Sequence, residues 1–216
     1  LVVAFAGAIF AIHTTTVANA VFLFAATPLM TAVLGWLILR EPVRPATWAA
    51  IALATVGIYV MVREGLSLGA GLGNLAALLS AVGFAAFTIT LRWGRLSDMI
   101  PATLIGAILA AVAAAIVVAL RGESFALPIR GVLIAMGIGA IILGVGLSIF
   151  TLGSRVVPAA ELSILALVEV LLGPVWVWIF LGETASSGIF LGGAILLTAI
   201  LGNALAGQRQ RAARPG

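Results

Sequence analysis

The amino-acid sequence predicts an all-α integral membrane protein with eight helical segments. Three observations predict it. The composition is 63% hydrophobic and only 8% charged, uncharged stretches long enough to cross a bilayer follow one another, and the basic residues stand singly or in pairs between them. A soluble domain carries about a quarter charged residues because its surface faces water. With a mean hydropathy of +1.30, this chain is expected to have lipid as its solvent.

The uncharged stretches define the segments, since a helix needs about 20 apolar residues to cross the hydrocarbon core. The first stretch, 1–39, is too long for one span, and the polar run 13–16 (His-Thr-Thr-Thr) predicts a turn at the membrane surface. A second interruption falls at 182–184 (Gly-Glu-Thr). Helices are expected throughout because the runs lack the alternation of barrel strands and lipid tolerates no unpaired backbone. The predicted segments are 1–12 (the end of a helix), 17–39, 46–62, 69–91, 99–120, 131–152, 158–181 and 186–207.

The arginines predict the orientation, because cytoplasmic loops carry the excess of basic residues. All basic residues are Arg, and they divide unevenly between the two sets of alternating loops. One set holds Arg40, Arg44, Arg92, Arg95, Arg155, Arg209, Arg211 and Arg214, and the other holds Arg63, Arg121 and Arg130. The first set, which includes the basic tail 208–216, is therefore expected in the cytoplasm. The tryptophans fall toward predicted span ends, as an aromatic belt requires: Trp36, Trp48, Trp93, Trp176 and Trp178.

Composition also argues against several classes of protein. The net charge of +4 is spread between apolar runs, so nucleic-acid binding is not expected. Without Cys there is no disulfide or thiolate metal site, and His13 alone cannot hold a metal, so no metal or cofactor is expected. A P-loop needs a Lys that the chain lacks; active transport would draw on an ion gradient or on exchange. The start, Leu1, lies inside an apolar run without the features of a signal peptide, which predicts that the true N-terminus is missing.

A faint internal repeat appears at an offset of 142 residues. At that offset Trp36 meets Trp178 and Glu41 meets Glu183, and three aliphatic pairs also match: Ala18 with Ala160, Val33 with Val175 and Leu39 with Leu181. In the predicted topology the two copies face opposite ways, which is the signature of an inverted-repeat transporter. Equal halves would require two more spans in front and a ten-helix protein.

The repeated stretches resemble the EamA-domain family of the drug/metabolite transporter superfamily. The first copy reads His-Thr-Thr-Thr-Val-Ala-Asn-Ala over 13–20, Thr-Pro-Leu over 27–29 and Leu-Arg-Glu-Pro over 39–42, followed by a helix that bears Gly57. The second copy reads Val-Pro-Ala-Ala-Glu over 157–161, Leu-Val-Glu over 167–169 and Leu-Gly-Glu-Thr over 181–184. The family usually has Pro after the second acid, where this chain has Val170 and then Pro174.

The resemblance implies ten helices in two inverted five-helix repeats around a cavity that opens alternately to each side. Residues 1–62 would be the C-terminal part of the first repeat (helices 3–5, helix 3 partial), and 69–207 the second repeat (helices 6–10). It also implies a permease of the bacterial inner membrane that exports amino acids, metabolites or drug-like molecules, often with proton exchange. The expected partners are the lipid bilayer and a small-molecule substrate, and a homodimer is left open.

Glu169 is the main candidate for function, since it lies near the middle of segment 158–181. An ionisable group at that depth usually marks a substrate or ion path, so Glu169 is expected to bind substrate or couple protons. The alternative is a protonated Glu that bonds a neighbouring helix. Glu161 follows Pro158 in the first turn of its helix, where the dipole favours a carboxylate; Asn19 occupies its place in the first repeat, and the two are a weaker candidate pair for lining a cavity.

Two prolines lie inside predicted helices, Pro28 and Pro174. Each removes a backbone donor and clashes with the carbonyl four residues back, that of Phe24 or Val170. A freed carbonyl at membrane depth must face protein or a water-filled cavity, so Thr27 and the two prolines are candidates for the pathway; a static kink is the equal alternative. The glycine-rich stretches, which are 137–146 and Gly188 with Gly192, are expected to let helices pack closely. Glu41 and Glu183 are expected to be solvated.

Two other function classes remain open. Residues 65–69 match a nucleophile elbow and 71–76 imitate a dinucleotide loop, yet neither has the required context, since one lies in a loop and the other follows no strand. An integral-membrane enzyme on lipid-like substrates would need clustered Asp, His or Cys, and the chain has one Asp and one His. A membrane assembly protein without transport activity is the third class. No catalytic residues are predicted.

Overall fold

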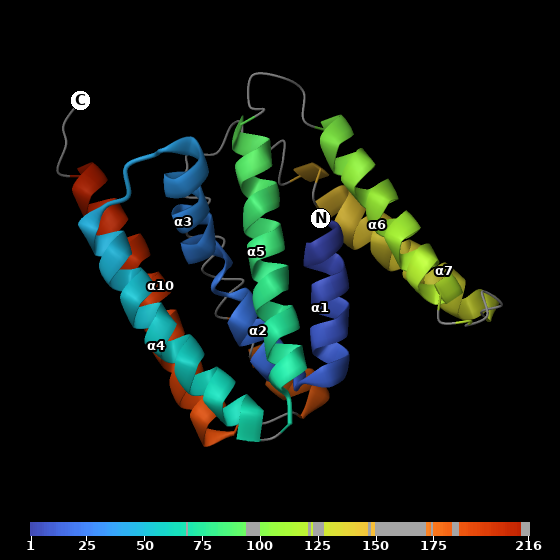
Figure 1. Cartoon of the computed structure of the whole chain (residues 1–216), viewed down its shortest axis with the longest axis horizontal. Helices are drawn as coiled ribbons and strands as arrows, with labels where there is room; N and C mark the ends of the chain where they lie inside the picture. The colour runs from blue at the N-terminus through green and yellow to red at the C-terminus, as the bar shows by residue number, and fades with distance from the viewer. Residues whose placement is uncertain are drawn as a thin grey trace.

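The computed structural model describes the chain as a bundle of α-helices, with no strand in the described residues. Those residues are 1–67, 69–93, 100–120, 122, 128–146, 148–149, 172–173, 175–182 and 186–212. The elements, labelled where there is room in Figure 1, are α1 (Val2–Thr14), α2 (Val17–Phe24), α3 (Thr27–Leu39), α4 (Pro45–Ser67), α5 (Gly71–Trp93), α6 (Ile100–Leu120), α7 (Ile129–Gly137), the π-helix η1 (Ile138–Val145) and α10 (Ser187–Ala212).

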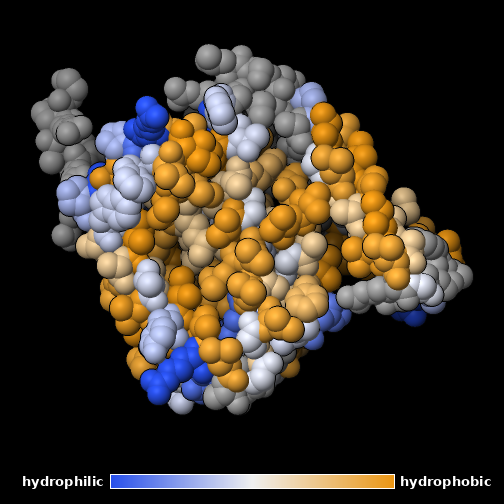
Figure 2. All heavy atoms as spheres, in the orientation of Figure 1, coloured by the Kyte–Doolittle hydropathy of each residue, from blue (hydrophilic) through white to orange (hydrophobic). Residues whose placement is uncertain are grey.

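Four helical stretches are long and apolar enough to cross a membrane: Val17–Leu39, Pro45–Glu64, Gly71–Trp93 and Ser187–Gly207. Their outward faces carry large apolar side chains, such as Leu37 and Leu72, that are mostly exposed. Figure 2 shows hydrophobic side chains across the middle of one face, with hydrophilic residues gathered toward its two ends. This distribution suits a bundle surrounded by lipid, and the predicted all-α membrane fold is confirmed.

Two tightly packed helix pairs, α1 with α5 and α4 with α10, flank the α2–α3 stretch. Close approach depends on residues without a side chain, since a Cβ on Gly7 would lie 2.8 Å from the Ala76 carbonyl oxygen and one on Gly83 2.8 Å from the Ala4 nitrogen. The Ser80 hydroxyl donates to the Ala4 carbonyl at 2.6 Å. Small residues thus allow α1 and α5 to meet backbone to backbone.

The second pair, α4 with α10, meets at Gly57 and Gly192. A Cβ on Gly57 would lie 2.6 Å from the Gly192 carbonyl oxygen, so the predicted packing role of Gly192 is confirmed. Nearer the other end of the pair, the buried Thr47 hydroxyl donates to the Asn203 side-chain oxygen at 2.7 Å. Interhelical bonds of this kind complement small-residue packing in membranes.

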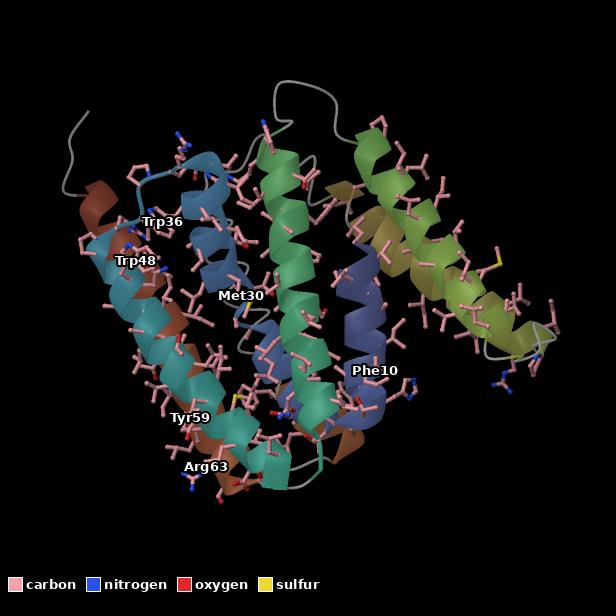
Figure 3. The ribbon with its side chains drawn as sticks, in the orientation of Figure 1. Phe10, Met30, Trp36, Trp48, Tyr59 and Arg63 are labelled. Carbon is pink, nitrogen blue, oxygen red and sulfur yellow. The ribbon has the colours of Figure 1, made fainter. Side chains whose placement is uncertain are left out.

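The described helices alternate in direction as the sequence predicts. At one end of the bundle, uppermost in Figure 1, Arg92 of α5 pairs with Glu41 after α3. The Arg44 guanidinium lies against Gly207 of α10 at the same end. At the opposite end Thr14 of α1 contacts Gly73 of α5. Arg63 lies there as well, and Figure 3 shows it near the lower end of α4, far from Trp36 and Trp48.

Glu41 forms an exposed ion pair after α3. Glu41 was expected to be solvated, and its side chain is 41% exposed; its carboxylate also accepts from the Arg92 guanidinium, with one oxygen at 2.9 Å and the other at 3.1 Å. The turn before it explains the position: Arg40 has a left-handed φ of 54°, and the N–H of Glu41 bonds the Gly35 carbonyl at 3.2 Å. This turn directs the Glu41 side chain toward α5.

A left-handed φ occurs at matching positions of the two stretches that are similar at an offset of 142. Gly182, which stands 142 residues after Arg40, has φ of 63° and follows the described helical residues 175–181. The left-handed conformation is rare for residues other than glycine. Its recurrence at equivalent positions therefore adds a conformational match to the Trp, Leu and Glu matches in sequence.

Segment 131–152 differs from a plain α-helix. It begins as α7 and continues as the π-helix η1, a form that usually lasts a single turn. Among the described atoms nothing lies within 4 Å of a Cβ built on Gly137, Gly139 or Gly146. Their predicted role in close packing is therefore not seen in this part of the structure. Segment 158–181 is described only from residue 172 onward, and not at 174.

Candidate functional site at the broken helix

The span 17–39 is interrupted in the middle. Helix α2 ends at Phe24 and α3 begins at Thr27, with Ala25 and Ala26 between them. An interruption near Pro28 was expected, and it is present, while Ala25 and Ala26 keep right-handed helical angles. Pro28 lies in the first turn of α3, and without an N–H it cannot bond the Phe24 carbonyl four residues back. The proline thus interrupts the hydrogen bonding of the span between α2 and α3.

Thr27 supplies the hydrogen bond that Pro28 cannot. Its hydroxyl donates to the Phe24 carbonyl at 2.6 Å, the group that would accept from residue 28 in a continuous helix. A buried carbonyl without a partner costs about 1–3 kcal/mol, so this hydroxyl stabilises the break. Thr27 was a candidate for the pathway, and in this structure its hydroxyl is bonded to the backbone.

The break is packed against protein. Ala25, Ala26 and Leu29 are buried in one cluster with Ala54 of α4 and Leu196 of α10. Met30, labelled in Figure 3, packs against the same cluster. Irregular backbone at membrane depth is tolerated where protein or an aqueous cavity covers it. The centre of the described bundle is therefore an interrupted helix held between two pairs of continuous ones.

A buried polar cluster lies at one end of α2. Thr16 caps the helix by accepting from the Asn19 N–H at 3.2 Å. The Asn19 side-chain nitrogen donates to the Thr15 hydroxyl at 2.9 Å and also to the Asn74 side-chain oxygen. Thr15 donates to the same Asn74 oxygen at 3.4 Å. Asn19 and Asn74 are 0% and 1% exposed, so two helices meet here through amides removed from solvent.

Two atoms of this cluster have no partner in the described structure: Oδ1 of Asn19 and Nδ2 of Asn74. Turning both amides over would exchange donors and acceptors and again leave one oxygen and one nitrogen unpaired. Each such buried group costs about 1–3 kcal/mol. Buried polar groups are nearly always satisfied in proteins, so this shortfall marks the cluster as a candidate functional feature.

The cluster contains one of the predicted site residues and one that the sequence reasoning missed. Asn19 is buried as a cavity-lining candidate could be, whereas Thr27 is half-buried and Pro28 is exposed. Glu161, Glu169 and Pro174 lie outside the described residues. Asn74 lies in the stretch 71–76 and was not predicted as a site residue. It could have been found as a polar amide side chain within the otherwise apolar predicted span 69–91.

The comparisons with known proteins agree with this architecture. The family model of the EamA-like transporter family matches residues 1–63. That segment contains α1, the polar turn, the broken α2–α3 and nearly all of α4. No curated protein and no solved structure matches the chain. Residues 1–63 are thus similar to the EamA-like transporter family, and the four helices long and apolar enough to cross a membrane make the chain a multi-pass membrane protein.

Proposed function

We propose that the protein is a secondary transporter that moves a small molecule across the bacterial inner membrane by alternating access. The observation that carries the proposal is the interrupted helix α2–α3, which packs at the centre of the described bundle. It lies within residues 1–63, the segment that matches a transporter family. Discontinuous helices at the interface between repeats are where such transporters place their substrate and ion sites. The export of amino acids, metabolites or drug-like molecules is the activity that the family resemblance favours.

Two inverted repeats, 1–62 and 69–207, are part of the proposal, and the packing of α4 on α10 supports them. Gly57 lies against Gly192. The residues 142 positions away from these two are Ala199 and Ala50, and both are buried in one cluster of the same helix pair. A two-fold axis between the helices would produce this exchange of small residues. The left-handed φ angles at Arg40 and Gly182 support the same symmetry.

Glu169 is proposed as the acid that couples transport to protons, on the sequence argument that a carboxyl group deep in a span marks an ion path. Glu161 and Pro174 are proposed pathway residues of the second repeat, and Asn19, Thr27 and Pro28 of the first. The greater number of arginines at the end of the bundle that contains Arg44 and Arg92 supports a cytoplasmic location for that end and for the C-terminus.

The test uses the full-length protein in proteoliposomes with a pH-sensitive dye inside. Pools of amino acids, nucleosides and cationic drugs are added in turn to the wild type and to Glu169→Gln. The proposal expects proton flux that depends on one pool and disappears in the variant, together with uptake of a labelled member of that pool. Flux that persists in Glu169→Gln would reject the coupling role, and the absence of both flux and uptake in folded wild type would reject transport.

A further inference from the structure

We propose, on the basis of the transport function above, that Asn19 and Asn74 form a closing contact of the pathway. The contact would hold α2 against α5 when that end is shut and separate when it opens. It would lie at the end of the bundle where Thr14 meets Gly73. The first argument is position, since Asn19 lies in the first turn of α2 and Asn74 in the first turn of α5. The contact thus joins the first predicted repeat to the second near the membrane surface.

The break between α2 and α3 allows this contact to open by itself. At the far end of the stretch, Glu41 after α3 is held to α5 by Arg92. The two ties to α5 are separated by Ala25 and Ala26, where the helix is interrupted. A continuous helix would move both ties together. With the interruption, α2 can leave α5 at one end while α3 remains attached at the other, which is what alternating access requires of its two closures.

The hydrogen bonding of the pair is the second argument. Four polar side chains are buried in the described residues: Asn19, Thr47, Asn74 and Ser80. Thr47 and Ser80 make short bonds to Asn203 and to the Ala4 carbonyl, and their hydroxyls have partners. Only the two asparagines keep an unpaired atom in the described structure. Water entering an opened end would satisfy both atoms, so opening regains hydrogen bonds that the shut contact lacks.

The experiment measures access to a reporter that α2 covers. Ala77 lies one turn after Asn74 and is 0% exposed, in a cluster with Ala20 and Leu23 of α2. The chain has no Cys, so Ala77→Cys in full-length protein freed of other cysteines reports alkylation by a membrane-impermeant maleimide. Intact cells and inverted vesicles are compared. Ala20→Cys, from the opposite side of the contact, is a second reporter in case the first perturbs packing.

Asn74→Ala should raise the alkylation rate about tenfold, a change equivalent to about 1.4 kcal/mol. The rise is expected only when the maleimide is added on the membrane side where Arg63 lies. Asn19→Leu with Asn74→Leu should lower alkylation below the wild type and slow transport, because two apolar groups of the same shape close without unpaired atoms. Ser80→Ala is the matched control, since it removes a buried bond from α5 that faces α1, and it should leave the rate unchanged.

An unchanged rate in Asn74→Ala would overturn the closing contact, as would an equal rise in Ser80→Ala. Transport by the wild type in the same preparation separates the two proposals. If the wild type transports and the rate does not respond, the closing contact fails alone. If the folded wild type transports nothing, the proposed function fails, and the closing contact that rests on it fails with it.

Discussion

Gly57 of α4 and Gly192 of α10 lie so close that a Cβ on either would be 2.6 Å from the carbonyl oxygen of the other. Gly192→Ala should therefore push the helices apart and lower the free energy of unfolding by about 1–3 kcal/mol, the usual cost of overpacking. The measurement is unfolding of the purified protein in mixed micelles. Gly202→Ala on the same helix is the control, since no described atom lies within 4 Å of its Cβ position. That variant should be neutral or more stable by up to about 1 kcal/mol; equal losses in both would contradict the packing.

Thr27→Val keeps the shape of the side chain and removes the hydroxyl that serves the Phe24 carbonyl. Because Pro28 offers no N–H, the carbonyl loses its partner, and the free energy of unfolding should fall by about 1–2 kcal/mol. Thr198→Val is the control. Its hydroxyl also bonds a carbonyl, that of Ala194 at 2.7 Å, at an exposed position of a continuous helix, where the carbonyl keeps a backbone donor. The control should change stability by less than about 0.5 kcal/mol.

Pro28→Ala restores an N–H that can bond the Phe24 carbonyl and join α2 to α3. Stability should be unchanged or slightly higher, because alanine is the best helix former, while solute uptake in proteoliposomes should slow several-fold as the two halves lose independence. Pro45→Ala is the matched control, since Pro45 begins the continuous helix α4 and its replacement should leave uptake unchanged. Uptake at the wild-type rate in Pro28→Ala would show that the break is a static kink.

Much of the fold could be predicted from local signals. The turn after α1 follows from four polar residues, and the interruption of the second span from a proline that cannot donate. The observed α4 and α10 extend beyond the predicted 46–62 and 186–207, because helices continue past the apolar core into the polar interface. The tight approach of Gly192 was predictable from its spacing to Gly188.

Other features depend on contacts between residues far apart in the chain. Asn74 is a candidate because it is hydrogen-bonded to Asn19, which is 55 residues away. No periodicity within α5 predicts that pairing. The ion pair of Glu41 depends on the left-handed turn at Arg40, a conformation that sequence would assign to glycine. The π-helix η1 lies in an apolar stretch whose sequence predicts an ordinary α-helix. Tertiary contacts decide the asparagine pairing and the ion pair.

The ion pair between Glu41 and Arg92 should contribute little to stability, because both side chains are about half exposed. Glu41→Gln is expected to lower the free energy of unfolding by less than about 1 kcal/mol at low salt. Raising the salt concentration to 1 M should remove the difference by screening, and Glu41→Arg with Arg92→Glu should restore part of it. A loss of several kcal/mol that persists in high salt would mean that Glu41 has a further partner.

The distribution of arginines predicts which end of the bundle faces the cytoplasm, and two exposed positions can test it. His13 lies in the last turn of α1 at the Arg63 end, and Trp93 ends α5 beside Arg92 at the other. Both side chains are exposed, and a chain without Cys allows single cysteines there. Impermeant maleimide should label His13→Cys on intact cells and Trp93→Cys only in inverted vesicles, because the end richer in Arg stays inside. The reverse pattern would overturn the orientation and leave the alternation intact, whereas labelling of both from one side would contradict the alternation itself.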